Sequence, residues 1–172
     1  MVELHLQDFE YNKKLFNQEK AKLQKFLPSQ TPIDHVGSTA IPNMVGKNII
    51  DILVGASNEQ QFEELFNFIC QAGYFPSKKK NPDYQFFAST EAETGNGDTH
   101  IHLAIIETER YSDFLSLRDY LLSNPDVAHQ YSNLKKQLLE AGISNRSNYK
   151  KQKSEYVSAL IIQAGKNSKE KK

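Results

Sequence analysis

The run NIIDILV, residues 48–54, constrains the fold more than any other stretch of the sequence. Aliphatic and β-branched residues fill it, as is typical of a strand buried in a sheet. Asp51 interrupts the run, and the alternation of a strand places its side chain on one face with Ile49 and Leu53. A buried carboxylate without a partner is costly, so Asp51 needs a cation, a metal ion or several N–H donors beside it.

The remaining periodicities predict an α+β fold with a C-terminal helical segment. Strand patterns occur at 32–36, 48–54, 84–89 and 99–106, and helical patterns at 8–27, 58–72, 109–123, 125–141 and 147–164. We find no repeat and no linker, so we expect one domain over residues 1–165, with the last helices packed on the sheet. The polar segment 166–172 is predicted to be disordered.

Composition sets limits on partners and location. Lys and Arg total 21 and Asp and Glu total 21, so no overall charge draws the chain to nucleic acid or to an anionic membrane. The sequence contains neither a signal-peptide core nor a run of the roughly 18 apolar residues that a membrane span needs. Cys70 stands among apolar residues and is interpreted as a small buried hydrophobe. We therefore expect a cytoplasmic protein without a membrane partner.

A Gly-Ser turn, Gly37 and Ser38, follows the first predicted strand. Such a turn exposes backbone N–H groups and a hydroxyl, which are suitable partners for phosphate oxygens. The alternative is purely structural: Asp51 hydrogen-bonds this loop and holds its shape.

Four separated segments, DHVGSTAIPNMVGKNIIDILVG, HIHLAI, FLSLRDYLLSNPDVAHQYSNLKKQLL and NYKKQKSEYVSALI, resemble the GrpB family in the same order. That family is grouped by similarity with the nucleotidyltransferases. The resemblance covers nearly the whole chain, and it implies a nucleotidyltransferase-like mixed β-sheet core with flanking helices.

The resemblance also implies a site. The Gly-Ser loop would bind a nucleoside triphosphate, and Asp51 would hold a divalent metal ion, Mg²⁺ or Mn²⁺. We add Thr39 and Lys47, which lie beside these motifs, to the predicted phosphate-binding residues. Active nucleotidyltransferases usually carry a second acid two residues after the first, and Leu53 stands there.

The C-terminal helices suggest an anion pocket independently of the resemblance. Their apolar stripes contain Arg118, Lys135 and Lys153, and Tyr131 and Tyr149 each lie four residues before one of these lysines. Long cationic side chains in such stripes must reach water, pair with acids or bind an anion. We predict that the three cations face Gly37 and Ser38 across a cleft.

Two histidines, His100 and His102, share one face of the strand 99–106, and His35 directly precedes Val36 and the Gly-Ser turn. They are either ordinary hydrogen-bonded histidines, groups that contact a phosphate or an Mg²⁺-bound water, or ligands of Zn²⁺ together with Asp51.

Three functions follow from these alternatives. The first is a nucleotidyltransferase-like enzyme that acts on an unknown acceptor. The second is a protein that binds a nucleotide or a phosphorylated metabolite without turnover, because Leu53 replaces the second acid. The third is a metal-dependent hydrolase built on His35, His100, His102 and Asp51.

Overall fold

The structure, a computed structural model, describes residues 4–91, 97–140 and 146–170. Its centre is a five-stranded sheet with the strand order β2-β4-β7-β6-β5. The strands are β2 (Ile33–Val36), β4 (Ile50–Ala56), β5 (Phe75–Pro76), β6 (Tyr84–Ala88) and β7 (Thr99–Ile105). β4 and β7 run parallel and the other neighbours run antiparallel, so the sheet is mixed. The predicted α+β class is confirmed.

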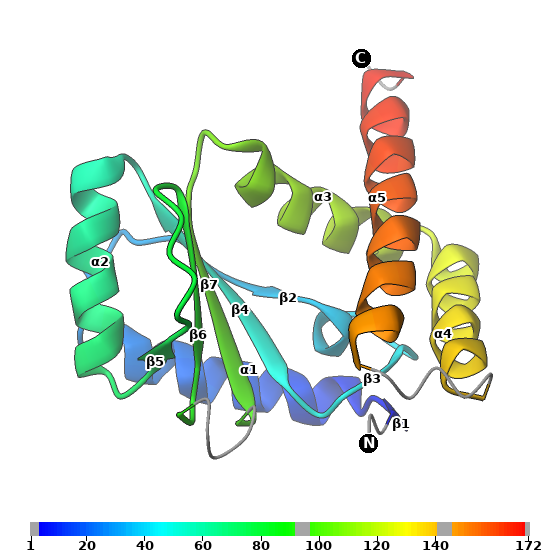
Figure 1. Ribbon diagram of the computed structural model, residues 1–172, viewed down its shortest axis with the longest axis horizontal. Coiled ribbons are helices and arrows are strands. Elements are labelled where there is room, and N and C mark those ends of the chain that lie inside the picture. The colour runs from blue at the N-terminus through cyan, green and yellow to red at the C-terminus, as the bar shows by residue number, and fades with distance from the viewer. Residues whose placement is uncertain (1–3, 92–96, 141–145, 171–172) are drawn as a thin grey trace.

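Helices α1 (Phe9–Leu23) and α2 (Glu59–Gln71) enclose the main core against one face of the sheet (Figure 1). Each begins at a side-chain cap, since Asp8 accepts from the Tyr11 N–H and Asn58 from the Gln61 N–H. The strand residues on this face are aliphatic, among them Ile52 and Val54 of β4. Cys70 is half-buried and packs against this core.

The C-terminal helices are α3 (Glu109–Ser123), α4 (Pro125–Glu140) and α5 (Arg146–Glu170). Only the first half of α3 packs on the sheet, where Tyr111 joins a small cluster with Val36, Leu53 and Ala104. The second half of α3 packs with α4 and α5 around Ile41 and Met44, forming a core of its own. The prediction that these helices pack on the sheet therefore holds for α3 alone; α4 and α5 lie beyond the β2 side of the sheet (Figure 1).

A short two-stranded sheet connects this helical cluster to the rest of the fold. β1 (His5–Leu6) pairs antiparallel with β3 (Val45–Gly46), and the 3-10 turn η1 (Ser38–Ala40) lies between β2 and β3. These two-residue strands have no readable alternation, so the sequence did not predict them.

The last two residues of the predicted tail, 171–172, lie outside the described residues. α5 continues through Glu170, so residues 166–170 are helical. Lys166, Lys169 and Glu170 in this segment are residues of high helix propensity, so a polar composition alone did not exclude a helix here. No helix in the described ranges is both long enough and apolar enough to cross a membrane.

Candidate functional site

Asp51 lies on the sheet face opposite the main core, next to two histidines. Parallel pairing sets Asp51 against His100 and Leu53 against His102, so both imidazoles reach the carboxylate from the neighbouring strand. His100 Nδ1 lies 3.3 Å and His102 Nε2 lies 3.4 Å from the same oxygen, Asp51 Oδ1. Burial raises the pKa of Asp51, but the hydrogen bonds from the two imidazoles outweigh it and hold this pKa below its ordinary value. Asp51 is therefore an ionised carboxylate, with a quarter of its side chain still exposed.

The Gly-Ser loop lies directly on the other oxygen of this carboxylate. Gly37 has a φ of +74°, and a Cβ at this position would overlap Asp51 Oδ2. Ser38 is held from its other side by β3, since a Cβ at Gly46 would overlap Ser38 Oγ. The predicted phosphate loop and the predicted metal carboxylate are thus in contact, and only glycine allows it at position 37.

His102 is held from both sides. Its Nδ1 lies 2.8 Å from the Tyr84 hydroxyl of β6, and Phe114 of α3 packs on its ring at 4.6 Å. An ionised carboxylate only accepts hydrogen bonds, so the neutral form of His102 that fits these contacts donates from Nε2 to Asp51 and accepts from Tyr84 at Nδ1. Burial is the main reason that the pKa of Tyr84 rises to about 12, so its hydroxyl keeps its proton.

His35 and Thr39 point away from this site. His35 pairs with Ile52, stacks on Phe16 of α1 at 4.6 Å, and lies 3.0 Å from the Thr39 hydroxyl. Its side chain is therefore on the main-core face, opposite that of Asp51, because successive strand residues alternate. Thr39 is fully buried. The structure brings together Asp51, His100 and His102, as predicted, but it does not bring His35 or the Thr39 hydroxyl to them.

Lys135 is a buried cation beside the loop. Its side chain is 3% exposed, its Nζ donates to the Val45 carbonyl of β3, and it lies 4.6 Å from the Tyr131 ring centroid. Burial, reinforced by the nearby charge of Lys153, lowers the pKa of Lys135 to about 7, and the Asp51 carboxylate opposes this shift. The lysine therefore lies within electrostatic reach of both Lys153 and the site carboxylate.

The other predicted phosphate ligands differ in position. Lys153 of α5 and Lys47, one residue beyond β3, are half-buried. Tyr131 is 6% exposed and stacks on Tyr156 at 5.5 Å, within the helical core. Tyr149 lies in α5, and its side chain is outside the described residues.

Arg118 does not match the predicted three-cation pocket. Its Nη1 donates to Asp34 Oδ1 at 3.2 Å and to the His35 carbonyl at 3.4 Å, and its Nε donates to Asp119 at 2.7 Å. Its charge thus has acidic partners inside the protein, and it fastens α3 to the edge strand β2. The sequence could not reveal this pairing, because Asp34 and Arg118 are 84 positions apart.

A metal ion at this site would have the carboxylate of Asp51 as its acidic ligand. Leu53, where a second acid would stand, is fully buried against Val36 and Tyr111. Across the described ranges, no three or more His, Cys, Asp or Glu side chains are arranged to hold a metal ion by themselves. Mg²⁺ is commonly held by one or two carboxylates together with substrate phosphates, and Asp51 fits that mode better than a zinc site made of protein ligands alone.

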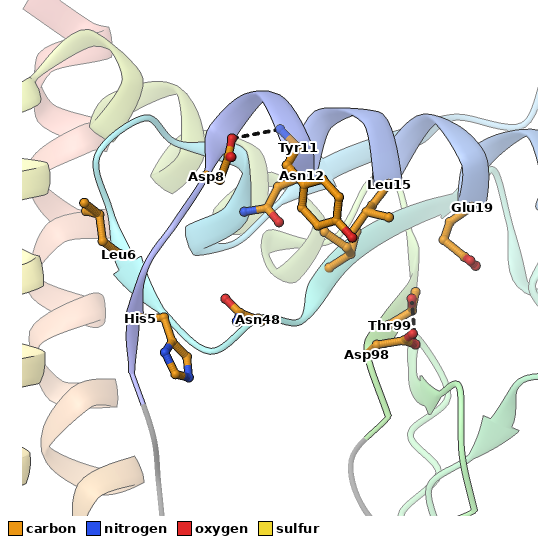
Figure 2. Close-up of a pocket in the computed structure, with 11 residues that line it drawn as sticks. His5, Leu6, Asp8, Tyr11, Asn12, Leu15, Glu19, Asn48, Asp98 and Thr99 are labelled. Atoms are coloured by element: carbon orange, nitrogen blue, oxygen red, sulfur yellow. Dashed lines mark hydrogen bonds between the residues drawn. The ribbon is translucent and has the colours of Figure 1, made fainter.

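A separate cleft of about 500 Å³ opens between α1 and the starts of β4 and β7 (Figure 2). Its acidic side chains have partners, since Asp8 caps α1 and Asp98 accepts from Ser89. Ile50 in its wall belongs to the main core, so the cleft lies on the sheet face opposite that of Asp51.

Comparison with known proteins identifies the family. The GrpB protein family matches residues 2–163. The chain belongs to the GrpB family. Glutamate-rich protein GrpB of Alkalihalophilus pseudofirmus is 33% identical over 87% of this chain and 88% of its own length. A UPF0157 protein of Streptomyces coelicolor is 24% identical over 95% of this chain and 86% of its own length. The resemblance found in the four sequence segments is confirmed.

The crystal structure of GrpB from Enterococcus faecalis has the same fold as this family member, with a TM-score of 0.81 and 23% identity over 96% of this chain and 99% of the other. A search of solved structures also finds Cid1 poly(U) polymerase bound to MgATP, with a TM-score of 0.46 and 9% identity over 77% of this chain and 45% of the other.

Three residues next to the site were missed from the sequence. Tyr84 and Phe86 both contact His102, and Ser132 accepts from the Val45 N–H at 3.0 Å. Tyr84 and Phe86 are recognisable only once the antiparallel register of β6 and β7 is known, which sets Phe86 against His102. Ser132 precedes Lys135 by three positions on one helix face, and this spacing was a usable signal.

Proposed function

We propose that this GrpB-family protein binds a nucleoside triphosphate with Mg²⁺ or Mn²⁺ and transfers its nucleotidyl group to an acceptor. The proposal rests on the contact between the Gly37 loop and the Asp51 carboxylate. Loop N–H groups suit phosphate oxygens, and an ionised, partly exposed carboxylate suits a divalent cation that the same phosphates share.

Asp51 would hold the metal ion, and Gly37, Ser38 and Lys135 would bind the phosphates, with Lys153 and Lys47 adding positive charge. When bound, the metal ion neutralises charge on the phosphates during transfer. The acceptor oxygen bonds to the α-phosphorus as the bond from that phosphorus to the bridging oxygen of the β-phosphate breaks. Pyrophosphate leaves, and the hydroxyl proton passes to water. The protein contributes mainly position and charge to this reaction.

The test is calorimetric titration with ATP, UTP, GTP and CTP in Mg²⁺ or Mn²⁺. Asp51→Asn keeps the size of the side chain and should abolish the metal-dependent part of binding, whereas Asp126→Asn, at an exposed position of α4, should bind as the unchanged protein does. Metal-dependent binding that survives in Asp51→Asn would refute the assignment of Asp51.

A second candidate is binding without turnover, which Leu53 favours because it removes the second acid. Pyrophosphate release separates the two candidates. Metal-dependent release that requires Asp51 supports transfer, and tight binding with no release in the presence of any acceptor supports the binding protein. The zinc hydrolase has no comparable support, because His35 lies on the sheet face opposite that of Asp51.

A further inference from the structure

The two oxygens of Asp51 face different parts of the molecule. Oδ2 lies against Gly37, which follows β2, and Oδ1 lies between His100 and His102 of β7. Because β4 lies between β2 and β7 in the sheet, the loop and the histidines flank the carboxylate on opposite sides.

This arrangement restricts where a second reactant can enter. In phosphoryl and nucleotidyl transfer the attacking and leaving oxygens lie roughly in line through the phosphorus. If the leaving pyrophosphate lies on the Gly37 side, the attacking oxygen must approach from the side of the histidines.

Phe86 forms an aromatic wall on that side. It pairs with His102 in the sheet register and packs edge-on against His100 at 4.8 Å and His102 at 5.6 Å. Phe86 is half-buried, and it belongs to none of the three apolar core clusters of the described residues. A flat aromatic face beside reactive groups suits a ring compound, which it can cover by stacking.

Charge on this side disfavours a polyanionic acceptor. β6 and β7, with the sequences YQFFA and THIHLAI, contain no lysine or arginine. Arg110 of α3 lies over the Tyr84 ring at 4.5 Å, and the acidic Asp113 beside it offsets its charge. The cations that could serve phosphates, Lys135 and Lys47, belong to the loop side. Among the described residues of this side, a nucleic acid strand would therefore find a single arginine, already offset by an acid, which is too little for the phosphate contacts on which its binding depends.

We propose that the acceptor binds over His100 and Phe86, on the β7 and β6 side of Asp51. The acceptor is then an uncharged hydroxyl compound that contains a ring, such as a sugar or a nucleoside. This inference rests on the proposed function, and it makes Phe86 a specificity-determining residue for the acceptor.

The experiment is an NMR titration of the full chain with ¹⁵N-labelled histidine, in Mg²⁺ and α,β-methylene-ATP. The probes are adenosine, methyl glucoside and an adenylate trinucleotide. Adenosine or methyl glucoside should shift the His100 and His102 signals saturably, and the trinucleotide should not. Phe86→Ala should weaken this binding by about tenfold, since stacking on an aromatic ring provides much of it. Phe86→Leu, which keeps an apolar side chain but no flat face, should weaken it too.

Phe26→Ala is the control, because Phe26 is 39% exposed and follows α1 on the far side of the sheet. The inference is overturned if neither neutral probe shifts the histidines saturably, if the trinucleotide binds there more tightly, or if Phe86→Ala leaves probe binding unchanged. Calorimetry with MgATP on the same variants keeps the two proposals apart. If the unchanged protein binds MgATP but none of the neutral probes, only the acceptor site is refuted. If the unchanged protein does not bind MgATP, the proposed function itself is refuted.

Discussion

Glycine at position 37 meets two separate demands, a left-handed backbone and contact with a carboxylate. Gly73 shares the first demand, with a φ of +92°, but a Cβ there would have nothing within 4 Å. Substitutions at Gly37 and Gly73 can therefore separate the effect of backbone strain from the effect of steric overlap.

We predict that Gly37→Ala abolishes metal-dependent nucleotide binding, because the new methyl group displaces the Asp51 carboxylate. Gly73→Ala should cost about 1 kcal/mol of stability from its backbone alone and leave binding intact. Urea denaturation and calorimetry on both variants provide the check. Equal effects of the two substitutions on binding would contradict an overlap at Asp51.

His35 links stability to acid pH. Burial is the main reason that its pKa falls from 6.5 to about 4, so the folded protein binds this proton less well than the unfolded chain. Stability from His35 is fully present above the unfolded pKa and is lost as pH falls toward the folded one.

The unchanged protein should lose unfolding free energy as the pH falls from about 7.5 to about 5. In His35→Phe, which keeps a ring stacked on Phe16, we expect this loss to be smaller by about 2 kcal/mol. Urea midpoints measured at both pH values test this, with His129→Phe as an exposed control. Parallel pH profiles for the protein and for His35→Phe would show that His35 titrates normally.

At the scale of elements, α4 closes the open edge of β3 with two side chains. Ser132 accepts from the Val45 N–H, and Lys135 donates to the Val45 carbonyl. One buried charge thus fixes the strand that supports Ser38, at an electrostatic cost to folding.

We predict that stability rises with pH between about 7 and 9 by about 2 kcal/mol from Lys135 alone, because its folded pKa of about 7 lies below the ordinary value of 10.5. Lys135→Met should remove this rise and also weaken nucleotide binding, whereas the exposed Lys136→Met should change neither. Chemical denaturation across this pH range is the measurement. A rise that persists in Lys135→Met would place its source elsewhere.

Arg118 joins α3 to β2 through an ion pair whose side chains are 20% and 34% exposed. We expect Arg118→Met to cost about 1 kcal/mol of stability, as is typical of partly exposed pairs, and to leave nucleotide affinity unchanged. A double-mutant cycle with Asp34→Asn should show coupling between the two sites. A large loss of nucleotide affinity in Arg118→Met would show that this arginine does take part in phosphate binding.

The sequence predicted the ends of most elements to within two residues, and it missed the C-terminal ends of α1 and α5 by more. The range 109–123 agrees with α3 at both ends, and β4 is displaced by two residues from the predicted 48–54. Asp51, His100 and His102 were predicted to share a cleft because alternation fixes the face of each strand residue. The partners of Arg118 and His102 were not predictable, because they depend on which elements become neighbours and in which register.

At the scale of the whole molecule, the candidate site lies where two cores meet. Its loop and carboxylate belong to the sheet, and Lys135 belongs to the helical cluster. A ligand that contacts both should therefore stabilise them together.

We predict that MgATP slows amide hydrogen exchange in α4 and β3 as well as in the Gly37 loop, with α2 much less affected. Mass-spectrometric exchange with and without nucleotide gives the answer, and Asp51→Asn is the control. Protection confined to the sheet would show that the nucleotide does not engage Lys135.

The parallel pairing of β4 with β7 also affects synthesis of the chain. Asp51 and His100 are 49 residues apart, and β4 lies between β2 and β7 in the finished sheet. Contacts so distant in sequence form late and slow folding. As the chain leaves the ribosome, the aliphatic β4 has only the edge strand β2 to pair with until β7 emerges. During that interval Asp51 is a hydrated charge within an aggregation-prone segment. We expect it to keep the nascent strand soluble until His100 and His102 have been synthesised.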